Sequence, residues 1–119
     1  MTLKEIRTVI EDRFLDIVIT IIESSPDKLR LIFRDGSFID IRISQKIKNR
    51  FDFHWERRHV DQTIYRYDNF PNTRFRKIKT FPYHFHKEKE SKVTESPFRK
   101  ELPLALIDFM EFIRETLKK

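Results

Sequence analysis

Apolar and polar residues alternate repeatedly between positions 28 and 67, and this alternation constrains the fold more than any other feature of the sequence. The alternating runs are residues 28–34, 37–43, 50–58 and 63–67. Successive side chains of a β-strand point to opposite faces, so each run predicts a half-buried strand. Asp35-Gly36, between the first two runs, is a strong hairpin signal. Short turns without helical crossovers indicate an antiparallel meander.

The flanking segments complete the expected architecture. Residues 3–14 carry apolar side chains at helical spacing, and Thr2 is placed to cap this helix. A β-branched run at 15–22 predicts another strand, and residues 81–86 predict a short sixth one. The sequence therefore predicts an α+β fold, an antiparallel β-meander of five to six strands with an N-terminal and a C-terminal helix packed on one face.

The C-terminal helix has an unusually wide apolar surface. One stripe is formed by Leu102, Leu106, Phe109, Met110, Ile113 and Leu117, and Ala105, Ile107 and Phe112 widen it. Such width indicates either deep burial of the helix in a small domain or contact of the helix with a second protein chain in addition to its own sheet. The second contact would form a homodimer or a hetero-complex through this helix.

The length of 119 residues predicts one domain. Within it we expect a motif-bearing sheet at 30–87, a mobile charged loop at 88–100 and the C-terminal helix at 101–118. No apolar run approaches the ~20 residues of a membrane span, and no signal-peptide pattern opens the chain. Cysteine is absent, which fits a reducing compartment. We therefore expect a cytoplasmic protein without membrane contact.

Charge is abundant and unevenly distributed. Charged residues make up 37% of the chain and glycine occurs once, a composition like that of thermophile proteins. Residues 42–87 hold twelve basic and four acidic residues, a balance of +8 that exceeds the net charge of +6 for the whole chain. A basic region beside aromatic residues indicates binding to phosphates or to an acidic partner, unless it is only a solvated surface.

Strand alternation predicts a polar sheet face opposite the core. The residues expected on it are Arg42, His54, Glu56, Arg66 and Asp68. Such a face is either a lattice of salt bridges or a functional site. Asp68-Asn69 also has the composition of a simple turn, a role that is compatible with a site.

Two histidines add a candidate reaction centre. His84 and His86 share one face if residues 81–86 are extended. They are solvent-exposed residues, or a general acid and base for RNA cleavage, or ligands of a metal whose third ligand the sequence does not identify. The expected RNA contacts are Arg58, Arg74, Arg76, Lys77 and Lys79. No glycine-rich phosphate loop, cysteine nucleophile, GxSxG elbow or HExxH helix is present.

Several motifs, in order along the chain, resemble the TumE-like toxins of prokaryotic toxin–antitoxin systems. They are Asp35-Gly36-Ser37-Phe38, Arg42, Phe53-His54, Tyr65-Arg66-Tyr67-Asp68-Asn69 and Phe81-Pro82-Tyr83-His84-Phe85-His86. The likeness extends from about residue 29 to 87. It departs from the family pattern after Pro71, where Asn72-Thr73 and a basic insertion replace a pair of histidines.

The resemblance implies a growth-inhibiting toxin that a cognate antitoxin silences. It points to Arg42, Arg66, Asp68, Asn69, His84 and His86 as site residues, and His54 joins them from the polar face. The leading hypothesis is a toxin that acts on RNA, with metal-independent cleavage as the candidate activity. The alternatives are a non-catalytic basic module that binds nucleic acid or a partner protein, and an inert remnant.

Overall fold

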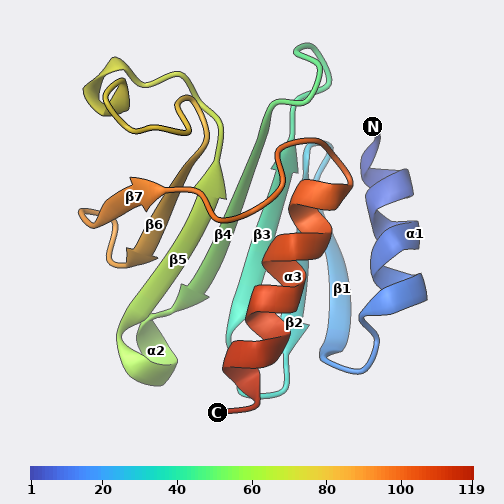
Figure 1. Cartoon of the computed structure of the whole chain (residues 1–119). Coiled ribbons are helices and arrows are strands. Elements are labelled where there is room, and N and C mark those ends of the chain that lie inside the picture. Colours follow the sequence, from blue (N-terminus) through green and yellow to red (C-terminus); the bar gives the residue numbers. More distant parts are fainter.

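A curved antiparallel sheet organises the molecule, as the computed structural model of all 119 residues shows (Figure 1). Its seven strands lie in sequence order, each hydrogen-bonded to the next. The strands are β1 (Val18–Ser25), β2 (Lys28–Phe33), β3 (Phe38–Ile43), β4 (Phe51–Arg57), β5 (Thr63–Asp68), β6 (His84–Glu88) and β7 (Val93–Glu95). The helices are α1 (Leu3–Arg13), α2 (Arg58–Asp61), α3 (Leu104–Leu117) and the 3-10 turn η1 (Thr73–Phe75).

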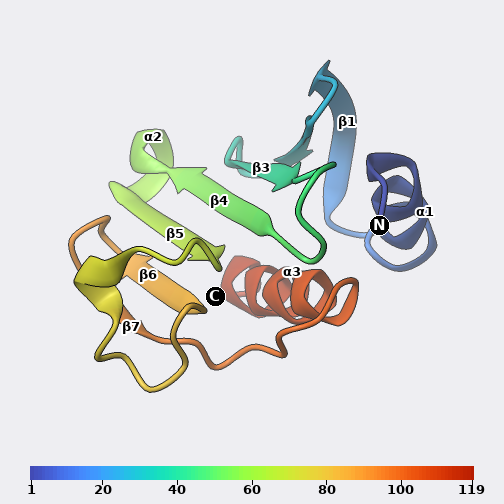
Figure 2. The same cartoon turned by 90° about the horizontal axis from the view of Figure 1, so that it is seen from above.

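The sheet curls around α3, while α1 lies beside β1 (Figure 2). The main apolar positions of the alternating runs face this concave side, where one cluster of 21 buried residues includes side chains from α1, α3 and the strands β1–β6. Ile32, Phe38 and Ile64 lie on the other face. Trp55, Phe53 and Phe109 are among its fully buried members. The prediction of an α+β meander with both terminal helices on the core is confirmed.

The curvature of the sheet explains the wide apolar stripe of α3. Six of its fourteen residues are buried, and Phe112 makes edge contacts with Trp55, Tyr65 and Phe85 on three different strands. A helix inside a curved sheet meets apolar side chains over more of its circumference than a helix on a flat sheet does. Deep burial therefore accounts for the width of the stripe.

Local boundaries differ from the expectation in several places. The strand expected at 15–22 is Val18–Ser25, and the C-terminal helix expected at 101–118 is Leu104–Leu117. Residues 93–95, inside the expected charged loop 88–100, pair with β6 as β7, so the sheet has seven strands. A three-residue strand is too short to produce a periodic signal. Between β4 and β5 the chain forms the short helix α2, which no alternating pattern predicts and which ends where Gln62 adopts a left-handed conformation at φ 66°. β6 begins at His84 and not at 81.

None of the helices has the length and apolar composition that a membrane span requires.

Candidate functional site

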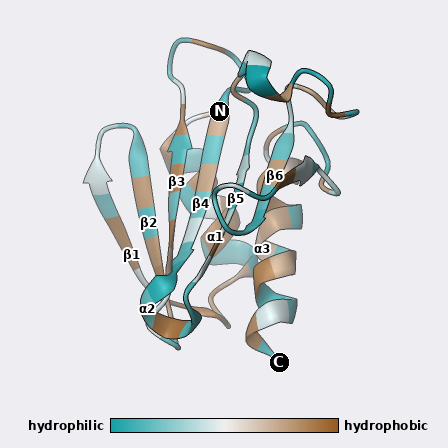
Figure 3. Cartoon of the chain, turned by 90° about the vertical axis from the view of Figure 1, so that its left-hand side faces the viewer, coloured by the Kyte–Doolittle hydropathy of each residue, from teal (hydrophilic) through white to brown (hydrophobic).

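The convex face of the sheet carries two rows of polar side chains, one strand after another. Strand register aligns Arg42, Asp52, Asp68 and His84 in the first row, and Asp40, His54, Arg66 and His86 in the second. The polar residues alternate with the core residues along each strand, seen as teal and brown bands in Figure 3. The face predicted from strand alternation is therefore present, and β6 adds both histidines to it.

Asp68 joins the two histidines into one buried cluster. Its Oδ1 lies 3.1 Å from Nε2 of His84, and its Oδ2 lies 3.7 Å from Nε2 of His86. The other ring nitrogens are also engaged. Nδ1 of His84 donates to the carbonyl oxygen of Pro82 at 2.9 Å, and Nδ1 of His86 donates to that of Glu90 at 2.8 Å. All three side chains are buried, so the prospect that these histidines are solvent-exposed is excluded.

These hydrogen bonds determine which ring nitrogens carry protons. A carbonyl oxygen only accepts, so each Nδ1 must carry a proton. In a neutral imidazole the lone pair would then sit on Nε2, which here faces the Asp68 carboxylate. Three electron-rich groups facing one another in a buried site repel unless a cation lies among them. The cluster therefore needs extra protons on the histidines or a bound metal ion.

Electrostatics around the cluster favour the charged forms. Burial would raise the pKa of Asp68, but hydrogen bonds from His84 and His86 outweigh it and lower this pKa to about 2. Burial would lower the pKa of His84, whereas its hydrogen bond and charge interaction with Asp68 raise it above the ordinary value. The carboxylate is thus ionised at neutral pH.

The same three residues suit a transition metal. One ligand atom from each of Asp68, His84 and His86 lies within 4.8 Å of the others. Two imidazoles and a carboxylate, with open positions left for water, are a common donor set of catalytic zinc, manganese and iron sites. Metal-binding histidines commonly donate their second ring N–H to a carbonyl or carboxylate, as both do here. Asp68 would be the third ligand of such an ion, the one that the sequence did not identify.

An acid–arginine network borders the cluster. Arg66 lies between Asp52, with Nε to Oδ1 at 3.3 Å, and Glu90, with Nη1 to Oε2 at 3.1 Å. Burial raises the pKa of Asp52, and the charge of Asp68 raises it further, against the opposing effect of Arg66. Sequence reasoning left Asp52 and Glu90 out of the site. Strand alternation could have found Asp52, whereas Glu90 reaches the site through the β6–β7 turn.

The remaining predicted residues take different positions. His54 pairs with Glu56 at 3.1 Å on the convex face, next to this network. Arg58 belongs to α2 at the other end of the sheet, pairs with Glu56 at 3.0 Å and lies away from the cluster. The expected RNA contact requires β4 to continue to residue 58, so that Arg58 lies on the polar face. β4 instead ends at Arg57.

Asn69 has a structural role. Its Oδ1 accepts from the backbone N–H of Phe51 at 3.0 Å, and its Nδ2 donates to the carbonyl of Asn49 at 2.6 Å. It therefore fastens the β3–β4 loop to the end of β5, beside Asp68. The turn role is also present, because the Phe70 N–H donates to Oδ1 of Asp68 at 3.1 Å.

Two basic loops flank the cluster end of the sheet. The β3–β4 loop (residues 44–50) and the β5–β6 loop (residues 69–83) both lie at the top of Figure 1. Their basic residues are Lys46, Lys48, Arg50, Arg74, Arg76, Lys77 and Lys79, and none pairs with a carboxylate. Phe75 of the second loop packs on His84 and His86, with ring centroids 5.0 and 6.1 Å away. Unpaired positive charge thus surrounds the cluster.

Comparison with known proteins decides the family. The sequence matches the family model described as Toxin TumE over residues 3–117. The chain belongs to this toxin family. It is therefore the toxin component of a toxin–antitoxin system, and the family implies a cognate antitoxin as its partner. No curated protein and no solved structure is significantly similar to it.

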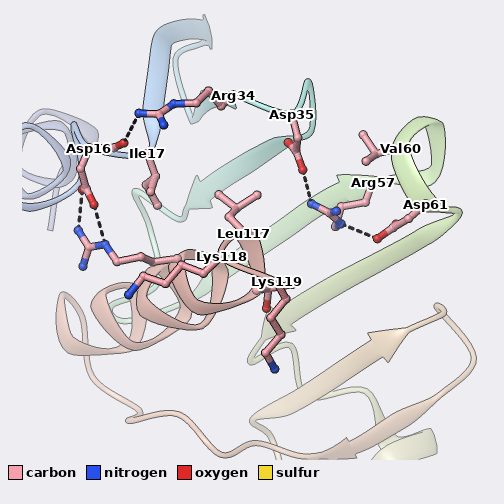
Figure 4. Close-up of a pocket in the computed structure, with 12 residues that line it drawn as sticks. Asp16, Ile17, Arg34, Asp35, Arg57, Val60, Asp61, Leu117, Lys118 and Lys119 are labelled. Atoms are coloured by element: carbon pink, nitrogen blue, oxygen red, sulfur yellow. Dashed lines mark hydrogen bonds and ion pairs between the residues drawn. The ribbon is translucent and has the colours of Figure 1, made fainter.

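This TumE-family chain also has a pocket of about 730 Å³ at the α2 end of the sheet, away from the cluster (Figure 4). Two of its three arginines are paired with carboxylates. Arg57 pairs with Asp35 at 2.7 Å and with Asp61 at 3.0 Å, and Arg114 pairs with Asp16 at 2.7 Å. The third, Arg34, donates to the Asp16 carbonyl oxygen at 3.1 Å. No histidine and no metal-ligand cluster lines this pocket, so its size alone does not make it the functional site.

Proposed function

We propose that this toxin inhibits growth by cleaving RNA, with the cluster of Asp68, His84 and His86 as its reaction centre. One observation carries the proposal. The buried cluster, which needs extra protons or a metal ion, lies at the end of the sheet where two loops hold basic residues without carboxylate partners. RNA is a polyanion, and unpaired Lys and Arg beside a site bind its phosphates with a gain from counterion release.

The geometry favours a metal over two freely acting imidazoles. In phosphoryl transfer the attacking and leaving oxygens lie roughly in line, on opposite sides of phosphorus. His84 and His86 lie side by side, with ring centroids 5.1 Å apart, and both face Asp68. They are not placed to act on two opposite sides of a phosphate. A shared divalent ion would polarise the phosphate and lower the pKa of a bound water.

The protein side chains then have distinct roles. Asp68, His84 and His86 hold the ion, while the carbonyl oxygens of Pro82 and Glu90 fix both rings through Nδ1. Arg66, between Asp52 and Glu90, is the nearest guanidinium to the cluster by strand register and can stabilise charge on the phosphate. The basic loops bring the RNA backbone to the site.

Induced expression in bacterial cells, without the antitoxin, tests the proposal. The wild type should stop growth and degrade cellular RNA, while His84→Gln and His86→Gln should do neither. His59→Gln is the matched control, because His59 is exposed at the α2 end and contacts the Gly36 carbonyl at 2.7 Å. Circular dichroism of each purified variant checks the fold. Continued growth arrest by folded His84→Gln and His86→Gln variants, or arrest with intact RNA, would refute the reaction centre.

The second candidate is a non-catalytic module that binds nucleic acid or a partner protein, favoured by the same unpaired basic loops. It predicts growth arrest that survives His84→Gln but is lost when Arg74, Arg76, Lys77 and Lys79 are replaced by alanine. Binding without any turnover of labelled RNA would favour this second reading.

A further inference from the structure

A smaller cleft of about 380 Å³ opens beside the reaction centre, between β3, the β3–β4 loop and the end of β5. Phe70 and Asp52 form the wall shared with the cluster. Phe70 follows Asp68 closely and donates its N–H to Oδ1 of Asp68, and Asp52 is the direct cross-strand partner of Asp68. Whatever occupies this cleft therefore lies next to the reaction centre.

Phe70 is an aromatic ring placed for contact with a ligand. Its side chain is 51% exposed, which is unusual for phenylalanine, and all the large aromatic residues of the core are covered. The guanidinium of Arg50 lies over the ring, with Cζ 5.3 Å from the centroid. An exposed ring beside an arginine forms a stacking platform that suits any nucleobase.

The charges of the cleft complement a phosphate. Arg42, Lys46 and Arg50 line it, and none of them pairs with a carboxylate. Two acids also line it, Asp27 and Asp52, and Asp52 faces Arg66. The three bases outnumber the two acids, so the net charge of the lining is positive, beside an aromatic ring.

We propose that this cleft binds one unpaired nucleotide of the RNA, its base stacked on Phe70 and its flanking phosphate held by Arg42 and Lys46. This inference rests on the proposed function and adds a substrate class to it: single-stranded RNA. A base in a duplex is stacked and paired, so its face is not free for Phe70. The bound nucleotide places the adjoining phosphate toward Asp68.

The test uses a single-stranded 2′-O-methyl RNA hexamer in buffer with EDTA, so that neither the 2′-hydroxyl nor a metal supports cleavage. Binding is measured by fluorescence anisotropy. Phe70→Ala should weaken binding about 5- to 150-fold, the effect of losing one stacked base. Ile47→Ala is the matched control, because Ile47 is equally exposed at 51% and lies in the β3–β4 loop, which borders the cleft, but does not line the cleft itself.

A second variant reports on the contact directly. Phe70→Trp should retain binding, and its emission should be quenched by the RNA, while the only native tryptophan, Trp55, is fully buried. Equal loss in Phe70→Ala and Ile47→Ala, or binding of a duplex as tight as that of the single strand, would overturn the cleft proposal. Normal RNA binding by Phe70→Ala would overturn it but leave RNA as the target, whereas no binding by the wild type would overturn both.

Discussion

The two ends of the sheet differ in how far their arginines are paired with acids. The α2 end has the larger pocket, where Arg57 and Arg114 are paired with Asp35, Asp61 and Asp16 and Arg34 donates only to a backbone carbonyl. The cluster end has a smaller cleft, unpaired basic side chains and a carboxylate that faces two imidazole nitrogens. The difference teaches that a basic region indicates a ligand only where its charges lack partners within the protein.

The largest expected effect is that of metal removal on the rate of RNA cleavage, which we assign to the cluster end. If the cluster end requires a cation, dialysis against EDTA should slow cleavage of labelled RNA by about 100-fold or more, because the phosphate loses its Lewis acid. Added Mn²⁺ or Zn²⁺ should restore the rate. Calorimetric titration with the same ions should show one site in the wild type and none in His86→Gln. If EDTA leaves cleavage unchanged but His86→Gln abolishes it, the positive charge in the cluster comes from protons on the histidines and not from a metal ion.

Replacement of an arginine should matter more for stability at the α2 end. Arg57 is buried and joins Asp35 and Asp61, so Arg57→Ala should lower the free energy of unfolding by about 2 kcal/mol. Arg74→Ala removes an exposed, unpaired side chain and should change it by less than about 0.5 kcal/mol. Urea denaturation measures both. Equal losses of unfolding free energy in Arg57→Ala and Arg74→Ala would contradict the difference between a paired and an unpaired arginine.

The salt dependence of RNA binding should respond only to charges at the cluster end. Arg74, Arg76 and Lys77 replaced together by alanine should reduce the slope of log K against log salt by about 2, or roughly 0.7 per lost phosphate contact. The triple variant of Arg34, Lys118 and Lys119 changes the net charge equally at the other end. Its slope should remain that of the wild type. Equal reductions would mean that net charge alone drives binding.

Acid should weaken the α2 end through its carboxylates. Burial would raise the pKa of Asp35, but hydrogen bonds from Ser37 and the guanidinium of Arg57 outweigh it and hold this pKa below its ordinary value. The stability it contributes is therefore complete above the unfolded pKa of about 3.9 and is lost as pH falls through the folded value.

The comparison between Asp35→Asn and the wild type checks this effect. At pH 7 the wild type should be more stable by about 1 kcal/mol or less, and the two should converge as the pH falls below the lowered pKa of Asp35. Asp12→Asn, at an exposed position without an ion pair, is the control and should show no such convergence. A constant difference between wild type and Asp35→Asn across this range would contradict the electrostatic account.

Sequence reasoning located most of the sheet and the parity of its faces, because alternation is a local signal. It placed Arg42, His54, Arg66 and Asp68 on one face and paired His84 with His86. It did not connect Asp68 to His84, because their register depends on how β6 docks beyond a long loop. That docking is set by the packing of Phe85 on Tyr65 and α3, which no local pattern encodes.

Burial of the two histidines was also outside the reach of the sequence. Phe75 packs on both rings from η1, and the carbonyl of Glu90 reaches His86 through the turn before β7. Both contacts come from segments without periodicity. Arg58 lies in α2 and not on β4 for a related reason, since a single-residue shift in the end of a strand moves a side chain to another environment.

One kinetic measurement tests the central claim most directly. Purified wild type and Asp68→Asn are incubated with labelled single-stranded RNA and Mn²⁺, and the rate of strand cleavage is measured for each. Asparagine preserves the shape of Asp68 but removes the charge that would hold a cation between His84 and His86. The account predicts cleavage by the wild type and a loss of about 100-fold or more in a folded Asp68→Asn. Equal rates for the two proteins, or intact RNA with the wild type, would contradict it.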